Sequence, residues 1–228
     1  MDFTPDDWTA IWLSLKVAGV ATLASLPLGI FIAHVLARKS FPGKLALNGL
    51  VHLPLVLPPV VTGYLLLLWF GAQGPAGKVL NQCCDIVLAF RWTGAALAAA
   101  VMGFPLMVRA IRLSIEAVDQ KLEGAAATLG ASPLRVFFTI TLPLSLPGII
   151  AGAILGFAKA LGEFGATITF VANIPGQTQT IASAIYAHIQ SPAGDAAAWR
   201  LTMVALVLAF AALMASELFA ERLGRKSA

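Results

Sequence analysis

The sequence predicts an all-α polytopic membrane protein with about five transmembrane helices in one domain, residues 1–228. Hydrophobic residues make up 59% of the chain and charged residues only 11%, whereas soluble domains average about 25% charged residues. Several apolar runs approach or exceed the ~18 residues that a helix needs to cross a bilayer. The charged residues gather at the ends of these runs, so the net charge of +4 indicates membrane orientation rather than nucleic-acid binding.

Five apolar segments are expected to span the membrane: residues 11–37, 50–70, 93–108, 144–161 and 201–218. The second segment contains three prolines, among them the adjacent pair Pro58 and Pro59, so a kinked or broken helix is expected there. The fourth segment carries Gly148, Gly152 and Gly156 at four-residue spacing. That spacing places small residues on one helix face and predicts close packing against a neighbouring helix.

The distribution of Lys and Arg predicts the orientation of the chain. With the N-terminus outside, ten basic residues fall on the inner side and three in the outer loops. Cytoplasmic loops carry the excess of Lys and Arg, so we expect a periplasmic N-terminus and a cytoplasmic C-terminus. The inner set is Arg38, Lys39, Lys44, Arg109, Arg112, Lys121, Arg135, Arg222, Arg225 and Lys226, and the outer set is Lys78, Arg91 and Arg200.

This orientation places the moderately polar segment 114–143 in the cytoplasm. Residues 122–129 are rich in Ala and favour a helix. Gly130 stands where a left-handed helix cap would fall, and Ser132 followed by Pro133 is typical of a helix start. The segment therefore predicts two short helices joined by a tight turn. We call residues 114–143 the elbow; a stiff elbow of this kind can fit a groove on a soluble partner.

The spacing within the elbow resembles the cytoplasmic loop signature of ABC-importer permeases. That signature is Glu-Ala-Ala, three residues, Gly, nine residues, Ile, one residue and Leu-Pro. Gly124 stands where the family has Glu, and the nearest carboxylate, Glu123, is displaced by about 100° around a helix. The residues in register with the signature are Ala125, Ala126, Gly130, Ile140, Leu142 and Pro143.

Other segments extend the resemblance to the molybdate permeases of this family. They are VHLPLVLPPVVTGYLLL at 51–67, FPLMVRAIRLSIEAVD at 104–119, TLGASPLRVFFTITLPLSLPGIIAG at 128–152 and LGEFGATITFVANIPGQTQTI at 161–181. Sulfate and tungstate permeases share parts of these segments, and the same machine carrying sulfate or tungstate stays an alternative. The short chain with about five spans is more similar to the molybdate branch.

The resemblance implies a homodimeric channel in a bacterial inner membrane that translocates molybdate. It also implies two cytoplasmic ATP-binding subunits, docked at residues 122–143, and a periplasmic oxyanion-binding protein. The residues expected to couple the chain to the ATPase are Glu123, Gly124, Ala125, Ala126, Leu129, Gly130, Val136, Phe137, Ile140, Leu142 and Pro143.

No motif of an active site occurs in the sequence. There is no phosphate loop of the GxxxxGK[ST] type and no G-x-S-x-G nucleophile elbow. The three histidines lack Cys or carboxylate partners at metal-ligand spacing. We therefore expect no catalytic residue, cofactor or metal in this chain, and ATP must be used by a separate subunit.

Six residues are candidates for the transport pathway: Pro58, Pro59, Lys159, Glu163, Thr167 and Thr169. Lys159 and Glu163 are four apart and can pair on a helix, and ionisable residues in a span are functional candidates. The alternative is an ion pair that reaches the outer interface. Thr167 and Thr169 supply hydroxyl donors suited to weak handling of an oxyanion, or they belong to an ordinary outer loop.

Two other classes of protein fit the sequence less well. A secondary transporter driven by an ion gradient would need acidic relays within the spans and internal repeats. Only Glu163 and Glu217 are candidates for such a relay, and no repeat is evident. A membrane-embedded enzyme would need a paired nucleophile and base, which the spans do not contain.

Overall fold

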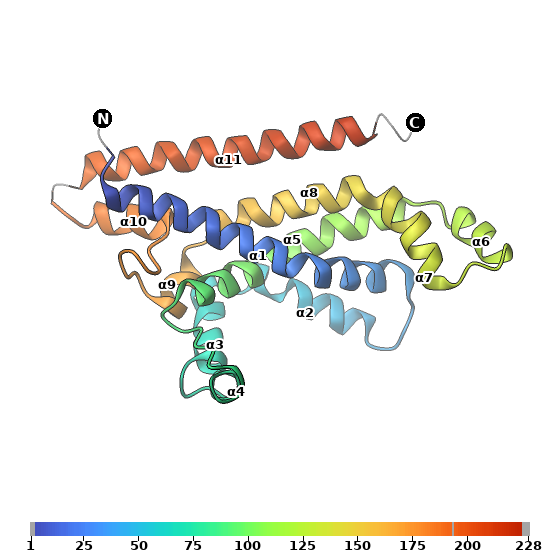
Figure 1. Cartoon of the computed structure of the whole chain (residues 1–228), viewed down its shortest axis with the longest axis horizontal. Coiled ribbons are helices and arrows are strands. Elements are labelled where there is room, and N and C mark those ends of the chain that lie inside the picture. The colour runs from blue at the N-terminus through green and yellow to red at the C-terminus, as the bar shows by residue number, and fades with distance from the viewer. Residues whose placement is uncertain (1–2, 193, 225–228) are drawn as a thin grey trace.

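The computed structural model describes residues 3–192 and 194–224, and the long helices of this part of the chain run along one long axis (Figure 1). Helix α5 packs against both α1 and α8, and α11 packs against α8. The elbow projects at one end of the bundle, and the N-terminus of α1 lies at the other (Figure 1). The long helices are α1 (Pro5–Arg38), α5 (Trp92–Ala117), α8 (Leu142–Leu161) and α11 (Asp195–Gly224).

The shorter elements connect these long helices. Helices α2 and α3 follow α1, and α4 follows them before the chain enters α5. Helices α6 and α7 form the elbow, and α9 and α10 lie between α8 and α11. Their bounds are α2 (Lys44–Val56), α3 (Pro59–Phe70), α4 (Pro75–Cys84), α6 (Gln120–Thr128), α7 (Pro133–Val136), the π-helix η1 (Phe137–Thr141), α9 (Gly165–Val171) and α10 (Ile181–Ile189).

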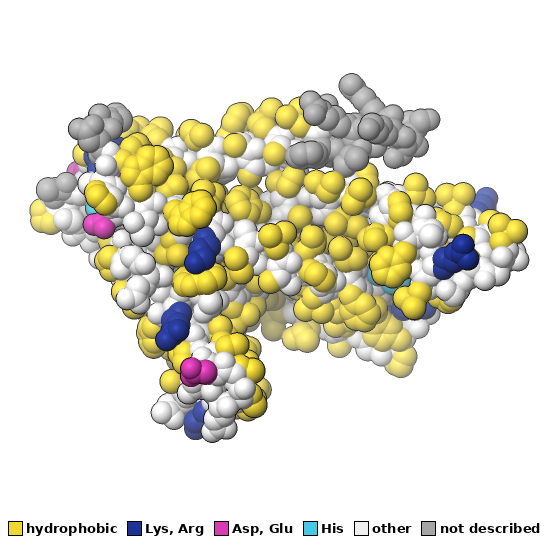
Figure 2. Space-filling model, in the orientation of Figure 1, with side chains coloured by type: hydrophobic (Ala, Val, Ile, Leu, Met, Phe, Trp, Pro, Cys, Tyr) yellow, Lys and Arg dark blue, Asp and Glu magenta, His cyan; other side chains and the backbone are white. Residues whose placement is uncertain are grey.

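The expectation of about five transmembrane helices is confirmed. In the described residues, four helices are long and apolar enough to cross a membrane, and a fifth crossing is made if α2 and α3 count as one broken span. The span expected over 93–108 is the apolar part of a longer helix, α5, which includes Arg109 and Arg112 and ends at Ala117. Figure 2 shows hydrophobic side chains over most of the bundle, with Lys and Arg near α4 and at the tip of the elbow.

The second span breaks at its adjacent prolines, as their ring chemistry requires. The chain bends by 113° between helices α2 and α3. Leu57 takes an extended conformation with φ −70° and ψ 142°, which is the conformation that a following proline favours. Pro58 and Pro59 have no N–H to continue the helix of α2, and Pro59 begins α3. Of the two expected forms, a kinked or a broken helix, the structure has the broken one.

Small residues allow α5 and α8 to approach closely. A Cβ atom at Gly156 would lie 2.8 Å from Cε of Met107, and one at Gly152 would lie 2.9 Å from Cγ1 of Ile111. On the facing helix, a Cβ at Gly103 would lie 2.9 Å from the carbonyl oxygen of Gly156. The glycine face predicted in the fourth segment thus packs against α5, where a larger side chain would separate the two helices.

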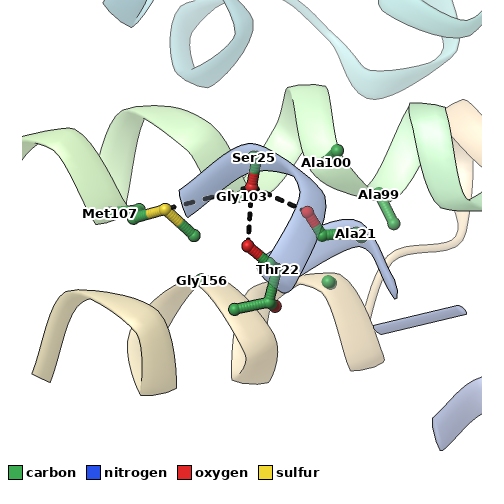
Figure 3. Close-up of a pocket in the computed structure, with 9 residues that line it drawn as sticks. Ala21, Thr22, Ser25, Ala99, Ala100, Gly103, Met107 and Gly156 are labelled. Atoms are coloured by element: carbon green, nitrogen blue, oxygen red, sulfur yellow. Dashed lines mark hydrogen bonds between the residues drawn. The ribbon is translucent and has the colours of Figure 1, made fainter. Parts of the chain in front are cut away.

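The crossing of α1, α5 and α8 is a packed core and not a ligand site (Figure 3). The hydroxyl of Thr22 donates to the carbonyl oxygen of Ala18 at 2.8 Å, and that of Ser25 donates to Ala21 at 2.7 Å. The Ala, Gly and Met side chains around them leave no void large enough for a water molecule. Both polar groups are satisfied within their own helix, so this crossing can be buried without cost to hydrogen bonding.

Candidate functional site

The first elbow helix, α6, ends at the glycine cap that the sequence predicts. Gly130 has φ +85°. Its N–H donates to the carbonyl oxygen of Ala127 at 3.0 Å, and the N–H of Ala131 donates to that of Ala126 at 3.1 Å. Glycine adopts this left-handed conformation at little cost, whereas a Cβ would be strained. The turn that bends the elbow is therefore set by local chemistry.

The second elbow helix begins as expected but does not end before the span. The Ser132 hydroxyl accepts the N–H of Arg135 at 3.4 Å, and Pro133 is the first helical residue. After Val136 the chain forms the π-helix η1 and runs directly into α8, so Pro143 lies inside a continuous helical segment. A proline ring clashes with the carbonyl four residues earlier. That residue, Thr139, lies in the wider π turn, which relieves the clash.

Glu123 joins three elements of the elbow region. One carboxylate oxygen accepts hydrogen bonds from Arg38 of α1, with Nη2 at 3.0 Å, and from the hydroxyl of Thr141 in η1 at 2.7 Å. Arg38 also donates to the carbonyl oxygen of Val118 at 2.8 Å. The side chain of Arg38 is 9% exposed and that of Glu123 is 19% exposed. We call Arg38, Glu123 and Thr141 the elbow clasp.

The clasp gives Glu123 a partner that the sequence does not reveal. Glu123 was expected to couple to an ATPase, but its carboxylate is directed into this chain and held by Arg38. The two residues are 85 positions apart, so no local spacing pointed to the pair. That separation explains why Arg38 was not among the predicted site residues; Thr141, 18 positions from Glu123, was not among them either.

Several large apolar side chains of the elbow are exposed. Leu129 is 89% exposed and Leu134 is 71% exposed, whereas Val136, which was expected to contact the ATPase, is 9% exposed and packs within the chain. Leu134 was not predicted as a contact. Leu134 falls in the first turn after the Ser132 cap and, together with Phe31 of α1, borders an apolar groove between the elbow and the bundle. Leu129 is the most exposed large apolar side chain of the elbow, followed by Leu134, Phe138 and Leu122.

Two glycines of the elbow give a matched test of its backbone. A Cβ at Gly124 or at Gly130 would meet no atom within 4 Å, but only Gly130 has a positive φ. We expect Gly130→Ala to lower the free energy of unfolding by about 1 kcal/mol because of left-handed strain. Gly124→Ala should raise it by up to about 1 kcal/mol, because alanine is the better helix former. Equilibrium unfolding in detergent measures both, and shifts of the same sign would contradict this account of the turn.

The break between α2 and α3 lies against a second break, which separates α8 from α9. A Cβ at Gly165, the first residue of α9, would lie 2.7 Å from Cβ of Pro59, the first residue of α3. One turn further on, a Cβ at Gly63 would lie 2.5 Å from the carbonyl oxygen of Ala166 and 2.9 Å from Cβ of Thr169. The structure thus brings the predicted pathway residues at the start of α3 together with those of α9.

Glu163 anchors the start of α9. Its side chain is 2% exposed, and one oxygen accepts the N–H of Ala166 at 3.0 Å. The other oxygen lies 2.8 Å from Nζ of Lys159, whose side chain is 31% exposed. The expected pair between Lys159 and Glu163 therefore forms, with its carboxylate buried and its ammonium partly open. A carboxylate at a helix N-terminus also interacts favourably with the helix dipole.

The hydroxyls of the two pathway threonines are engaged within α9. Thr167 donates to the carbonyl oxygen of Phe164 at 2.8 Å, and Thr169 donates to that of Gly165 at 2.8 Å. In this conformation neither proton is available to a passing oxyanion. Among the six predicted pathway residues, Lys159 is the cation that keeps a partly exposed donor.

The arrangement of helices resembles that of chains in solved ABC transporters. A bacterial alginate ABC transporter, in complex with an alginate pentasaccharide-bound periplasmic protein, matches with a TM-score of 0.73 at 18% identity, over 96% of this chain and 80% of that chain. An inward-facing MetNI methionine ABC transporter matches with a TM-score of 0.71 at 13% identity, over 94% of each chain. At these identities the likeness concerns the fold.

The family "Binding-protein-dependent transport system inner membrane component" matches residues 25–225, and the chain belongs to it. The molybdenum transport system permease protein ModB of Escherichia coli (strain K12) is 59% identical, over 99% of this chain and all of that protein. A putative molybdenum transport permease of Bacillus subtilis (strain 168) is 39% identical, with 89% of each chain covered. The sulfate transport permease CysT of Salmonella typhimurium is 35% identical, over 90% of this chain and 75% of that protein. The predicted resemblance is confirmed.

Proposed function

We propose that this chain is the permease subunit of an ATP-driven importer that carries molybdate across the bacterial inner membrane. The assignment of molybdate as the substrate rests on the 59% identity, over the full length, to a permease named for molybdenum transport. Identity to the sulfate permease is lower, at 35%. The same machine carrying sulfate or tungstate is therefore the weaker alternative, and a transporter driven by an ion gradient is weaker still.

The elbow supports the coupling to a separate motor. We propose that two cytoplasmic ATP-binding subunits dock on the elbows of a homodimer, with the exposed Leu129 in their grooves. ATP is bound by those subunits and not by this chain. The proposed orientation, with the N-terminus periplasmic and the C-terminus cytoplasmic, places the opposite end of the bundle towards a periplasmic oxyanion-binding protein.

The elbow clasp provides a route for the mechanical step. Glu123 of α6 is bonded both to Arg38 at the end of α1 and to Thr141 just before α8. A displacement of α6 by the motor would therefore move two long helices together and not the elbow alone. Such a linkage is what an alternation between two conformations needs, because the motor acts only at the elbow.

The pathway residues fit an anion that must be released. Molybdate is a tetrahedral oxyanion of charge −2, and Lys159 offers it a partly exposed ammonium at the helix breaks. Glu163 compensates the charge of Lys159, so the site attracts an anion only weakly. We propose that selectivity among oxyanions lies mainly in the binding protein.

A homodimer is supported by the exposed apolar faces of α2 and α3. Leu50 is 67% exposed, Val56 is 81% exposed and Val60 is 55% exposed, all near the break between the two helices. We propose that part of this face contacts a second copy and the rest contacts lipid. Two copies would then place their helix breaks around one pathway.

Uptake of labelled molybdate by vesicles that contain the whole assembly tests the proposal. We expect uptake that requires ATP and the binding protein, is competed by tungstate and is little affected by an equal concentration of sulfate. Vesicles without the ATPase subunits are the control. Stronger competition by sulfate would favour the sulfate alternative, and uptake driven by an ion gradient without ATP would contradict the coupling.

A further inference from the structure

Two adjoining cavities lie where the end of α1 meets the start of the second elbow helix. One is a groove of about 540 Å³, and the other is a smaller cavity of about 230 Å³. Four residues line both of them, so the two cavities are neighbours, and we call them together the hollow. These residues are His34, Lys39, Pro133 and Phe137.

The two parts of the hollow differ in chemistry. The groove continues along apolar side chains, including Phe31 and Phe138, which are 61% and 60% exposed. The smaller cavity continues towards the elbow clasp and is lined by Arg38, Glu123 and Thr141. The hollow is therefore apolar at one end and polar at the other, with His34 and Lys39 at the boundary.

The polar part carries an excess of positive charge. The charge of Arg38 is compensated by Glu123 at 3.0 Å. Lys39 is exposed and, within residues 3–192 and 194–224, takes part in no ion pair. An ammonium next to an exposed apolar groove at the end of a membrane helix matches one kind of molecule, which is negatively charged at one end and apolar at the other.

We propose that this hollow binds an anionic phospholipid, with its acyl chains in the groove and its phosphate at Lys39. A zwitterionic lipid could fill the groove but would gain less from the ammonium. The bound lipid would contact Pro133 and Phe137 of the elbow, so the composition of the membrane would influence coupling. Only the assignment to the cytoplasmic leaflet and this effect on coupling rest on the proposed function; the binding itself does not.

Lipid retention measured by native mass spectrometry tests the site without any transport assay. The permease, purified with its ATPase subunits, is released from nanodiscs containing equal amounts of phosphatidylglycerol and phosphatidylcholine. We expect preferential retention of phosphatidylglycerol and a decrease of ~5-fold in that preference for Lys39→Gln, the change expected for one basic residue near the membrane surface. Lys44→Gln is the matched control, because Lys44 follows closely in sequence but lines neither cavity.

The groove itself is tested separately. Phe138→Trp should be quenched by phosphatidylglycerol brominated on its acyl chains, and millimolar inorganic phosphate should not relieve the quenching. Equal lipid preference in the Lys39 and Lys44 variants would overturn the proposal, as would relief by phosphate. Efficient disulfide crosslinking of Phe31→Cys between two permease copies would also overturn it, because a second copy would then occupy the groove. Failure of molybdate uptake leaves these readouts intact and bears only on the proposed function.

Discussion

Glu123→Gln is expected to lower the free energy of unfolding by about 2 kcal/mol and to abolish most ATP-coupled uptake. Glutamine is neutral, so Arg38, whose side chain is 9% exposed, would lose its counter-charge. Hydrogen bonds to charged groups contribute about 1.5–3 kcal/mol each. The variant should still hydrolyse ATP in the assembled complex, because the outward face of the elbow is unchanged. Unfolding in detergent and paired assays of ATPase and uptake in proteoliposomes measure the two effects.

A nearby carboxylate provides the matched control. Glu116 pairs with Arg112 on the surface of α5, with side chains that are 37% and 30% exposed. Glu116→Gln should change stability by no more than about 0.5 kcal/mol. Thr141→Val should share part of the effect of Glu123→Gln, and the double variant should be less destabilised than the sum of the two. If Glu123→Gln behaves like Glu116→Gln, the clasp is not the link between the elbow and the bundle.

Glu163→Ala should be the most damaging change at the helix breaks, lowering the free energy of unfolding by about 3 kcal/mol. It removes the acceptor for the N–H of Ala166, a loss of about 1 kcal/mol for a helix cap. It also removes a buried side chain and its bond to Lys159, which adds about 2 kcal/mol. Glu163→Gln keeps an acceptor for Ala166 and should cost less. Unfolding in detergent, with molybdate uptake alongside, measures the series.

Variants of Lys159 separate packing from anion guidance. Lys159→Met leaves Glu163 buried without its partner, so stability falls for electrostatic reasons alone. The double variant Lys159→Met with Glu163→Gln should recover most of that stability. If uptake stays low in the double variant, Lys159 guides the anion, and the wild-type rate should also fall as ionic strength rises. Recovery of uptake together with stability would show that the pair is purely structural.

The elbow shows how far local chemistry predicts structure. The cap at Gly130 and the helix start at Ser132 and Pro133 depend on backbone conformations that these residue types favour by themselves. The broken second span was likewise predictable, because Pro58 and Pro59 cannot donate backbone hydrogen bonds wherever they stand. The continuation of the second elbow helix into α8 was not predicted, since Pro143 is tolerated only beside the π turn.

The direction of side chains was beyond local prediction. Val136 and Leu134 are both apolar residues of the same short helix, yet one is 9% exposed and the other is 71% exposed. Which of the two side chains is exposed to a partner depends on how the elbow is oriented relative to α1. The hydroxyls of Thr167 and Thr169 look equally free in the sequence, but the short helix α9 uses both protons internally.

Hydrophobic runs, prolines and glycines act through the backbone nearest to them, and from these residues alone the chain is predicted to be a bundle of membrane helices with a bent elbow. Only the tertiary structure decided that Glu123 bonds to Arg38 and that the break at Pro59 packs against Gly165. These contacts join residues about a hundred positions apart, and the packing of long helices sets them. The identity of a carboxylate or a glycine does not determine which distant residue it will contact. Such pairs can be identified only when the positions of the helices are known.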